Sequence, residues 1–360
     1  IALVNPNVQP TATVTLTAFD KNGVELRSTT VYLDPLCKVG GLVKDLFGGL
    51  TGTGWIEVES DMPIIGLLNF DDYVNRMGSM SGVTPATTIY FPHFHQDSAW
   101  QTYIAVVNPN STDGATVTFT AYRNDGTPTG APAVWYIGPR VKVGGLVHQI
   151  IPSATGTGWI TVESDLPIVG MLNFDDYKNR MGSMEACSSS YTLYFPHFHQ
   201  DSKWQTYVAF ANPSASETAY ADITAYRGDG TIAGTRELTL APHSKYGALV
   251  NSLVTGLTGT GWLEVVSSIP IVGMENFDDY QNRMGSLSAS IPQQTVFFPH
   301  FHRDSSWQTY VSIVNLGPAA TTVIDYWRSD GYWIGWTCTT LGNRCKTGTF
   351  TATGTGWLRC

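Results

Sequence analysis

The chain has 360 residues, of which 42% are hydrophobic and only 14% are charged, and its formal net charge is −9. This hydrophobic content is sufficient for folded cores, but no stretch approaches the roughly 18 consecutive apolar residues that a membrane-spanning helix needs. The acidic balance and the lack of a basic patch argue against binding to nucleic acid or to an anionic membrane surface. We therefore expect no nucleic-acid partner and no membrane span.

Many Thr, Ser, Gly, Tyr and Trp residues with few charges suit a β-protein that works outside cells, so we expect an extracellular or cell-surface location. The chain begins at Ile1, with neither an initiator Met nor a signal-peptide pattern. Removal of a leader would explain this start, and so would a chain that is a fragment.

One sequence pattern organises the chain: Phe-Pro-His-Phe-His-x-Asp-Ser-x-Trp-Gln-Thr-Tyr, at residues 91–103, 195–207 and 298–310. An apolar segment ending in Asn follows each copy, and the chain itself opens with such a segment. Ile1 therefore aligns with Ile104, Val208 and Val311, and the repeat is 103 to 104 residues long. This length is typical of a small domain with its own core. We predict three modules, 1–103, 104–207 and 208–310, and a partial fourth, 311–360.

The second module illustrates the predicted strands in chain order. Residues 101–108 are an apolar strand closed by an Asn-Pro turn. In 115–122, small and apolar residues alternate with Thr, which indicates a half-buried strand. The dipeptide Asp125-Gly126 favours a tight hairpin into the next strand, 133–137. All four copies keep such a turn, at Asn22-Gly23, Asp125-Gly126, Asp229-Gly230 and Asp330-Gly331.

The rest of the module contains further short strands. Residues 142–151 have mixed apolar spacing, so a short helical turn and a bent strand are both open. Trp159 begins a strand over 159–164, Leu166-Pro167 predicts a turn into a strand over 168–174, and the last strand covers 191–198. Many short strands with almost no helix signal predict an all-β fold of tandem antiparallel β-sandwich (Ig-like) modules of about 103 residues.

The repeated pattern carries six of the eight histidines, in pairs two residues apart. Residues two apart on a strand share a face, so each pair presents two imidazoles together, with an Asp just beyond. Three uses are open: hydrogen bonds across the sheet or between modules, a divalent metal site, or a pH-sensitive junction. The candidate metal ligands are His93, His95 and Asp97; His197, His199 and Asp201; and His300, His302 and Asp304.

An acidic loop, Asn69-Phe-Asp-Asp-Tyr-Val-Asn-Arg-Met-Gly78, recurs at Asn173 and Asn276. Its dense carboxylate and amide oxygens suggest Ca²⁺ as a ligand, but Val74 and Met80 stand where an EF-hand needs Gly and Glu. The alternative that we favour is structural. In it, Asp72 pairs with Arg76, and the Asp and Asn side chains bond to backbone groups of the loop.

Each module front has one Lys, and each first strand ends in one Asn. We expect these Lys side chains to be solvated. The alternative is an isopeptide bond between the two residues, because burial beside a carboxylic acid lowers the pKa of Lys and exposes a nucleophilic amine. The positions are Lys38, Lys142, Lys245 and Lys346, and Asn5, Asn108, Asn212 and Asn315.

Five cysteines are present, without the spacing of a Cys/His zinc site. Cys37 and Cys187 stand alone, whereas Cys338, Cys345 and Cys360 lie in the last partial module. For an exported protein, we predict a disulfide among these three. Cys345 occupies the repeat position of Cys37, so a bond between these sites in neighbouring molecules is a further alternative.

Six of the eleven tryptophans fall into two groups. One group recurs at a strand start, which favours the core: Trp55, Trp159 and Trp262. The other is a set of candidates for stacking on sugar rings: Trp135, Trp333 and Trp336.

Catalysis has little support in the sequence. His95, Asp97 and Ser98 are adjacent, but a nucleophile, its base and the orienting group need a convergent geometry that one strand does not provide. The sequence has no nucleophile elbow, phosphate loop or nucleotide fingerprint. We therefore expect a non-enzymatic protein without catalytic residues and without a firm cofactor.

Both ends of the chain are incomplete modules. The first lacks a preceding Phe-Pro-His-Phe-His strand, and 311–360 has about half the strands of a module, which is marginal alone. Disulfides would make this last piece a cap on module three. Alternatively, its open edges pair with the first module of another chain, and such head-to-tail contacts build fibres.

We accordingly predict a non-enzymatic extracellular structural protein, the subunit of a self-assembling surface fibre or filament. Its partner would be itself, in a head-to-tail homopolymer joined through the incomplete terminal modules. The alternative is an adhesin or carbohydrate-binding surface rod, whose repeated sites would bind glycans with avidity.

The order of motifs in the second module, from Phe-Pro-His through Trp-Gln-Thr-Tyr-Ile-Ala-Val-Val-Asn-Pro to Gly-Trp-Ile-Thr-Val-Glu-Ser-Asp-Leu-Pro-Ile-Val-Gly, resembles a tandem repeat of secreted and surface proteins of bacteria. The resemblance covers essentially the entire chain, and that family has no assigned activity. It implies export, β-sandwich modules and surface display. The paired histidines and the Asp-Asp-Tyr loops receive no meaning from it.

Overall fold

The computed structural model of the chain describes residues 1–72, 74, 76–348 and 352–360. These residues are folded mainly as antiparallel strands, with helices of only four residues, which confirms the predicted all-β class. The chain forms two compact units. The first comprises Ile1–Asn69, Met80–Gly82 and Gln293–Cys360, and the second comprises Phe70–Ser79 and Val83–Pro292. Within the described part of the chain, no helix is long and apolar enough to cross a membrane.

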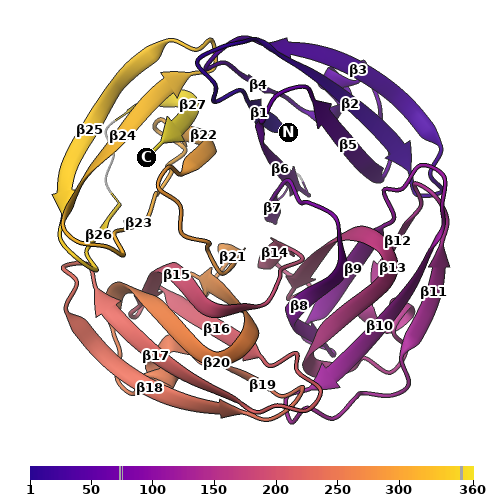
Figure 1. The fold of residues 1–360 in the computed structure, drawn as a ribbon, viewed down its shortest axis with the longest axis vertical. Helices are drawn as coiled ribbons and strands as arrows, with labels where there is room; N and C mark the ends of the chain where they lie inside the picture. Colours follow the sequence, from indigo (N-terminus) through magenta and orange to yellow (C-terminus); the bar gives the residue numbers. More distant parts are fainter. Residues whose placement is uncertain (73, 75, 349–351) are drawn as a thin grey trace. The chain divides into compact units, whose positions relative to one another are not determined.

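The first unit contains both the beginning and the end of the chain. Its elements are β1 (Ala2–Val4), β2 (Ala12–Asp20), β3 (Glu25–Leu33), β4 (Lys38–Gly40), α1 (Val43–Leu46), β5 (Gly54–Ser60), β6 (Ile65–Asp71), β7 (Met77–Ser81), β22 (Phe297–Arg303), β23 (Ile313–Val314), β24 (Ala320–Arg328), β25 (Trp333–Leu341), β26 (Lys346–Thr347) and β27 (Gly354–Arg359). One sheet has the strand order β3-β2-β5, and another has the order β22-β27-β24-β25 (Figure 1). A third sheet has the strand order β4-β1-β6-β7. Its strands β6 and β7 contribute residues to both units.

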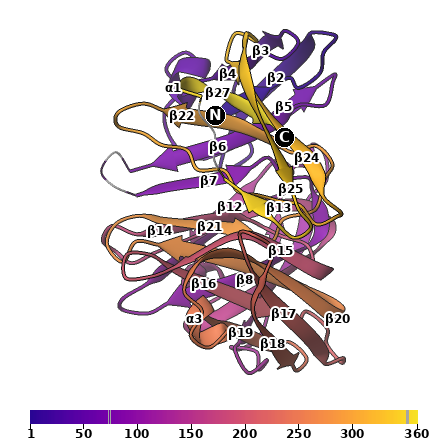
Figure 2. The ribbon, with the colours of Figure 1, turned by 90° about the vertical axis from the view of Figure 1, so that its left-hand side faces the viewer.

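The second unit contains two repeats with the same strand order. Its elements are β8 (Ala86–Gln96), β9 (Gln101–Val107), β10 (Ala115–Arg123), β11 (Ala133–Ile137), β12 (Lys142–Leu146), α2 (Val147–Ile150), β13 (Gly156–Asp175), β14 (Met181–Glu185), β15 (Ser190–Gln200), β16 (Gln205–Ala211), β17 (Ala219–Arg227), β18 (Ile232–Leu240), β19 (Lys245–Leu249), α3 (Val250–Leu253), β20 (Gly259–Asp278) and β21 (Met284–Ser288). One sheet has the order β11-β10-β13-β9-β12, and the other has the order β18-β17-β20-β16-β19. In each repeat a single long strand, β13 or β20, also pairs with two further strands. Helix α3 lies against β16 and β19 (Figure 2).

Local sequence signals predict most of these strands well. In β10 the alternating residues Ala115, Val117, Phe119 and Ala121 are buried, as the period of two requires. The hairpin glycines adopt the positive φ that their turns need, for example 88° at Gly126. Both alternatives for residues 142–151 are realised, as β12 followed by α2.

The Phe-Pro-His-Phe-His strands pair differently from our division into modules. We placed residues 91–103 at the end of the first module, whereas β8 pairs with β13 of the following repeat. β15 pairs with β20, and β22 pairs with β27, in the same way. The reason is connectivity. β8 continues into β9 through a short turn, and the two strands pair with successive parts of the long strand β13. Hydrogen bonding thus puts this strand at the start of a repeat.

A β-bulge in β8 decides which of its side chains face the core. Phe94 opposes Gly158 and Phe91 opposes Ile160, so two residues of β8 stand opposite one residue of β13. Strict alternation would put Phe91 and Phe94 on opposite faces, but the bulge turns both inward, and both are fully buried. Pro92 lies within this bulge, where a missing N–H is tolerated.

The predicted turn at Leu166-Pro167 is wrong, because β13 runs unbroken through it. Pairing with β10 stops at Ser164, and pairing with β9 begins at Val169. Pro167 lies between these two ladders, where its missing N–H removes no ladder bond. The strand therefore passes from one set of neighbours to the other.

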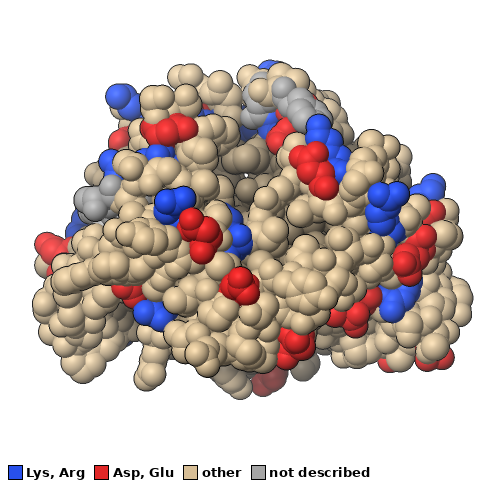
Figure 3. Space-filling model, turned by 90° about the horizontal axis from the view of Figure 1, so that it is seen from above, with Lys and Arg blue, Asp and Glu red and all other residues tan. Residues whose placement is uncertain are grey.

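Charged side chains are sparse on the surface. On the face shown in Figure 3, acidic and basic residues are interspersed and most of the surface is uncharged. This distribution agrees with the low charged fraction of the sequence and gives no single-sign field to attract a polyanion.

Candidate functional site: the contacts that join the repeats

Two buried ionisable groups from different repeats meet in the second unit. Nζ of Lys245, the first residue of β19, lies 2.6 Å from Nδ1 of His93 in β8 and donates to the carbonyl of Gly158 at 2.8 Å. Lys245 is 5% exposed and His93 is 7% exposed. The rings of Phe174 and Tyr207 pack on the imidazole, with centroids 5.3 and 5.4 Å away. We call this arrangement the Lys–His joint.

Burial favours the neutral form of both groups in the joint. Desolvation lowers the pKa of Lys245 well below its usual value, and desolvation, Lys245 and His95 together lower the pKa of His93. In its neutral form the amine has two N–H groups, which match two acceptors, Nδ1 of His93 and the carbonyl of Gly158. In that form both hydrogen bonds are made without a buried charge.

Backbone contacts surround the pair. Nε1 of the buried Trp159 donates to the carbonyl of His243 at 2.7 Å, and the N–H of Lys245 donates to the carbonyl of Asn124 at 2.9 Å. The hairpin glycine Gly126 is part of this fit, because a Cβ there would lie 2.4 Å from the carbonyl oxygen of Pro242. The Asp-Gly turn therefore makes the hairpin and also allows the next repeat to approach.

The same joint occurs in the first unit, between the last repeat and the first. Nζ of Lys38 lies 2.5 Å from Nδ1 of His300 and donates to the carbonyl of Gly356 at 3.0 Å. Nε1 of Trp357 donates to the carbonyl of Leu36, and the N–H of Lys38 donates to that of Ser329, each at 2.9 Å. Position by position, these residues correspond to those around Lys245. The last repeat therefore packs on the first in the structure.

This second joint is less enclosed. Burial lowers the pKa of Lys38 to about 8, and burial, Lys38 and His302 lower the pKa of His300 to about 4. A cavity of about 370 Å³ lies beside the pair, lined in part by Ile1, Leu67 and Asn69. In the second unit, the ring of Tyr207 packs against the histidine of the joint.

The structure separates the predicted metal ligands. The rings of His93 and His95 lie 6.3 Å apart, as expected for residues that share a face, but they have different partners. Nε2 of His95 lies 2.8 Å from Oδ2 of Asp97, whose Oδ1 accepts the N–H groups of Ala99 and Trp100 in the turn. Across the described residues, no three His, Cys, Asp or Glu side chains gather closely enough to hold a metal ion. The His/His/Asp metal site therefore gains no support.

The other copies follow the same arrangement. His199 and Asp201, and likewise His302 and Asp304, are joined at 2.8 Å through Nε2 and Oδ2. His197 lies 6.2 Å from His199, and His300 lies 6.4 Å from His302, measured between ring centroids.

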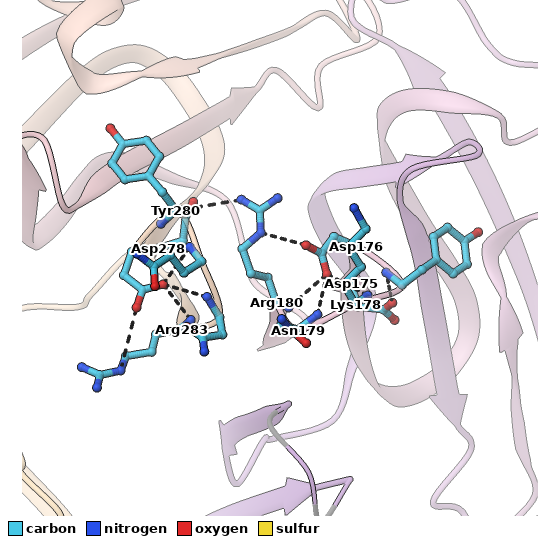
Figure 4. A network of polar contacts seen from close by, with 12 residues as sticks. Asp175, Asp176, Lys178, Asn179, Arg180, Asp278, Tyr280 and Arg283 are labelled. Carbon is cyan, nitrogen blue, oxygen red and sulfur yellow. Dashed lines mark hydrogen bonds and ion pairs between the residues drawn. The ribbon is translucent and has the colours of Figure 1, made fainter.

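The Asp-Asp-Tyr loops are held by their own carboxylates (Figure 4). Oδ1 of Asp176 accepts the N–H groups of Lys178, Asn179 and Arg180, each at 3.0 Å, and Oδ2 lies 2.9 Å from Nε of Arg180. Burial opposes ionisation, but these hydrogen bonds hold the pKa of Asp176 below its ordinary value. Both oxygens thus have protein donors, which favours the structural alternative over Ca²⁺.

The first and third loops repeat this pattern. Nε of Arg76 lies 2.8 Å from Oδ2 of Asp72, which confirms the predicted pair. Asp279 accepts three loop N–H groups in the third loop. Tyr73 and Asn75 lie outside the described residues.

Arginines link each loop to the next within the second unit. Nη1 of Arg76 lies 3.4 Å from Oδ1 of Asp175, and Nη1 of Arg180 lies 3.6 Å from Oδ1 of Asp278. Gln101 and Gln205 donate to the same two Asp carboxylates. We call this chain of contacts the loop ladder. The side chain of Arg283, in the third loop, is 78% exposed.

The lysines were misassigned from sequence. We expected solvated side chains, but Lys38 and Lys245 are buried. The isopeptide alternative gains no support either, since the amine of Lys245 faces His93. The Nδ2 group of Asn212 instead donates to the carbonyls of Glu217, Leu240 and Ala241. Lys and His both recur at the repeat spacing. This recurrence could have indicated that they pair, but our sequence analysis did not draw that conclusion.

The cysteines form no disulfide, although the structure describes all five. The predicted bond among Cys338, Cys345 and Cys360 is thus not present in this structure, and Cys338 is exposed on β25. The terminal piece instead contacts the first repeat through the joint at Lys38.

The tryptophans divide only in part as predicted. Trp159 and Trp262 are fully buried, but Trp55, which we also assigned to the core, is only partly buried. Trp333 and Trp336 are 48% and 56% exposed on β25. Trp135 is only partly exposed, and its Nε1 donates to the carbonyl of Ile150.

Comparisons with known proteins do not identify this chain. No protein-family model matches it, and no curated protein matches it. Among solved structures, the crystal structure of Thermotoga maritima 1070 is similar over 29% of this chain and 97% of that chain, with 14% identity and a TM-score of 0.26. Bacteroides uniformis β-glucuronidase 2, bound to cyclophellitol-6-carboxylate aziridine, shares 10% identity over 59% of this chain and 27% of that chain, with a TM-score of 0.13.

A calcium-binding mutant of the same glucuronidase shares 9% identity, with a TM-score of 0.14. This chain spans only 26% of that structure. Likenesses at these scores carry no argument about fold or function.

Proposed function

We propose that this chain is a non-enzymatic structural protein that works outside the cell and joins its last repeat to its first. The observation that carries the proposal is the Lys–His joint, which occurs between successive repeats at Lys245 and between the two ends at Lys38. A chain whose ends fit each other as its own repeats do is self-complementary. Such ends close within one chain or join copies head to tail, and head-to-tail joining builds fibres.

The use of the candidate residues supports a structural role. Histidines and acidic residues that suggested chemistry in the sequence are engaged in packing and hydrogen bonding: His93 with Lys245, His95 with Asp97, and Asp176 with Arg180. The extracellular location rests on composition and on the family resemblance.

A cross-link tests the joint between the ends. A Cβ at Gly331 would lie 2.9 Å from Sγ of Cys37, which is close enough for a disulfide. We would make Gly331→Cys in a chain whose other four cysteines are replaced by Ala, accepting about 1–2 kcal/mol of strain from the positive φ of Gly331. The control is the same chain with Cys37→Ser.

After oxidation, non-reducing electrophoresis distinguishes the outcomes. A compact cross-linked monomer means that the ends close within one chain, and a ladder of multiples means that they join copies into a fibre. Whichever cross-linked product forms, its loss in the Cys37→Ser control shows that Cys37 is one of the two residues joined. If no cross-link forms in the folded chain, the ends do not join and the proposal is wrong. Electron microscopy of the unmodified protein then shows whether fibres exist.

A second candidate, glycan binding, rests on the exposed aromatic residues at the start of β25 and just before it. Tyr332, Trp333 and Trp336 are all more than one third exposed. Aromatic faces of this kind are well suited to stacking. A glycan array with the intact protein and with Trp336→Ala tests this alternative, which predicts binding that the substitution removes.

A further inference from the structure

A cavity lies in the second unit, beside the loop ladder. It has a volume of about 400 Å³ and is formed by two segments of one repeat, the turn between β8 and β9 and the loop between β13 and β14. This volume is typical of sites that bind small molecules. Its lining includes Ser98, Ala99 and Trp100 from the turn, and Tyr177, Lys178 and Arg180 from the loop.

The aromatic side of the cavity is held in place by contacts at both ends. The N–H of Tyr177 donates to Oδ1 of Asp175 at 2.9 Å, and its hydroxyl donates to the carbonyl of Asp97 at 3.3 Å. The ring therefore spans from the loop to the turn, and the residue is still 47% exposed. Trp100 stacks on His95, with centroids 5.9 Å apart. A fixed and half-exposed aromatic ring is well suited to packing against a sugar ring.

The charged groups of the cavity are not equally available to a ligand. Both carboxylate oxygens of Asp176 accept donors from the loop, and Arg180 contacts Asp176 and Asp278 (Figure 4). Lys178 is exposed, and its ammonium has no ion-pair partner among the described residues. Lys178 is therefore the cation that a negatively charged ligand can approach in this cavity.

The next repeat has the same aromatic arrangement. Trp204 stacks on His199, with centroids 6.1 Å apart. Tyr280 is 43% exposed, and its hydroxyl donates to the carbonyl of Asp201 at 3.3 Å. These residues correspond to those around Tyr177.

The two repeats differ in where the lysine stands. Gln281 occupies the position of Lys178 in the loop, and Lys203 occupies the position of Ala99 in the turn. Lys203 is exposed, as Lys178 is. Each repeat thus has one exposed lysine beside its Trp and Tyr, supplied from opposite sides. This exchange indicates that the positive charge itself is used there.

We propose that each of these places binds a hexuronic acid residue of an acidic glycan. We call them the Tyr–Lys sites. The Tyr ring packs against the sugar ring, and the Lys ammonium binds the sugar carboxylate. Two sites on one chain strengthen binding to a polymer that carries acid groups along its length. The first site consists of Trp100, Tyr177 and Lys178, and the second of Trp204, Lys203 and Tyr280.

Titration calorimetry of the intact chain tests this proposal, with trimers of galacturonic acid and of mannuronic acid as probes. We expect saturable binding of at least one trimer, at two sites per chain. The methyl ester of that trimer keeps the sugar rings but lacks the charges. It should bind at least about tenfold more weakly, the effect expected when a hydrogen bond between charged groups is lost.

Moving the charge locates the first site. Lys178→Gln should weaken it at least about tenfold, so that one site per chain remains. Adding Ala99→Lys puts the lysine where the next repeat has it, and this change should restore two sites. Lys178→Gln combined with Lys203→Ala should abolish binding. A lysine with a merely structural role would not show such a rescue.

A second variant removes the ring. Tyr177 has a φ of 59°, which Gly adopts without strain, so Tyr177→Gly should leave the loop folded and still reduce binding to one site. Trp336→Ala is the control, because Trp336 belongs to the glycan candidate on β25 in the first unit and its loss should change nothing.

Four results would overturn the proposal. Neither acid trimer binds at any reachable concentration, or the methyl ester binds as tightly as the acid. Lys178→Gln and Tyr177→Gly leave binding unchanged, or Trp336→Ala removes it, which would place the glycan at β25. The inference does not depend on the proposed joining of the ends, which involves none of these residues.

Discussion

Nζ of Lys245 lies 2.6 Å from Nδ1 of His93, although 152 residues separate them in the chain. Both groups are buried, and desolvation lowers both pKa values. Desolvation thus favours the neutral form of each group, and the contact fixes how one repeat meets the next.

Removing one partner of this joint should cost more than replacing both. His93→Ala removes an acceptor and leaves a cavity beside a buried amine, so we expect the free energy of unfolding to fall by about 2–4 kcal/mol. His93→Leu combined with Lys245→Met replaces both polar partners by apolar groups and should cost only about 1 kcal/mol. Urea unfolding measures both. Equal losses in the two variants would contradict a neutral, desolvated pair.

The joint at Lys38 should make stability depend on pH in two windows. The pKa of His300 is about 4 in the folded protein, so the unfolded chain binds its proton first as the pH falls from 6.5. Stability due to this group is therefore present above pH 6.5 and is lost between 6.5 and about 4. The pKa of Lys38 is about 8, so stability should rise again between pH 8 and 10.5.

Chemical denaturation across this range measures both effects. Lys38→Met should abolish the alkaline rise, and His300→Gln should reduce the acidic loss. An alkaline rise that persists in Lys38→Met would show that another group causes it.

The loop ladder offers a matched pair of arginines. Arg180 contacts Asp176 and Asp278, whose side chains are 8% and 6% exposed, so Arg180→Ala removes the positive charge beside two buried carboxylates and leaves them only their neutral N–H donors. We expect a loss of about 2–4 kcal/mol in the free energy of unfolding. Arg283→Ala, at a side chain 78% exposed, should cost less than about 0.5 kcal/mol. Similar effects at the two sites would mean that the ladder adds no stability.

Two glycines separate backbone strain from the fit between repeats. Gly126 and Gly156 both have positive φ, 88° and 73°, but only Gly126 faces another repeat, at Pro242. Gly156→Ala should cost about 1–2 kcal/mol through strain alone. Gly126→Ala should cost clearly more, because its Cβ would meet the Pro242 carbonyl oxygen. Thermal unfolding of the two variants compares these costs directly. Equal shifts of the unfolding temperature would show that the two repeats do not meet at Gly126.

The sequence by itself determined the local features. Alternation in β10, the Asp-Gly hairpins and the pairing of Asp72 with Arg76 could all be predicted, because each depends on residues within one strand, turn or loop. The all-β class followed from the number of short strands and the lack of helix signals.

Tertiary structure decided what the recurring residues do. The partner of Lys38 is His300, 262 residues away in the chain. No local sequence pattern indicates that two such distant segments meet. The assignment of β8 to the following repeat depends on the ladder with β13, and the turn predicted at Pro167 failed because a long strand changes neighbours there. Burial also reversed our expectation for the lysines. A charged side chain is expected at the surface unless its desolvation is compensated, and here a histidine nitrogen and a carbonyl from another repeat supply that compensation.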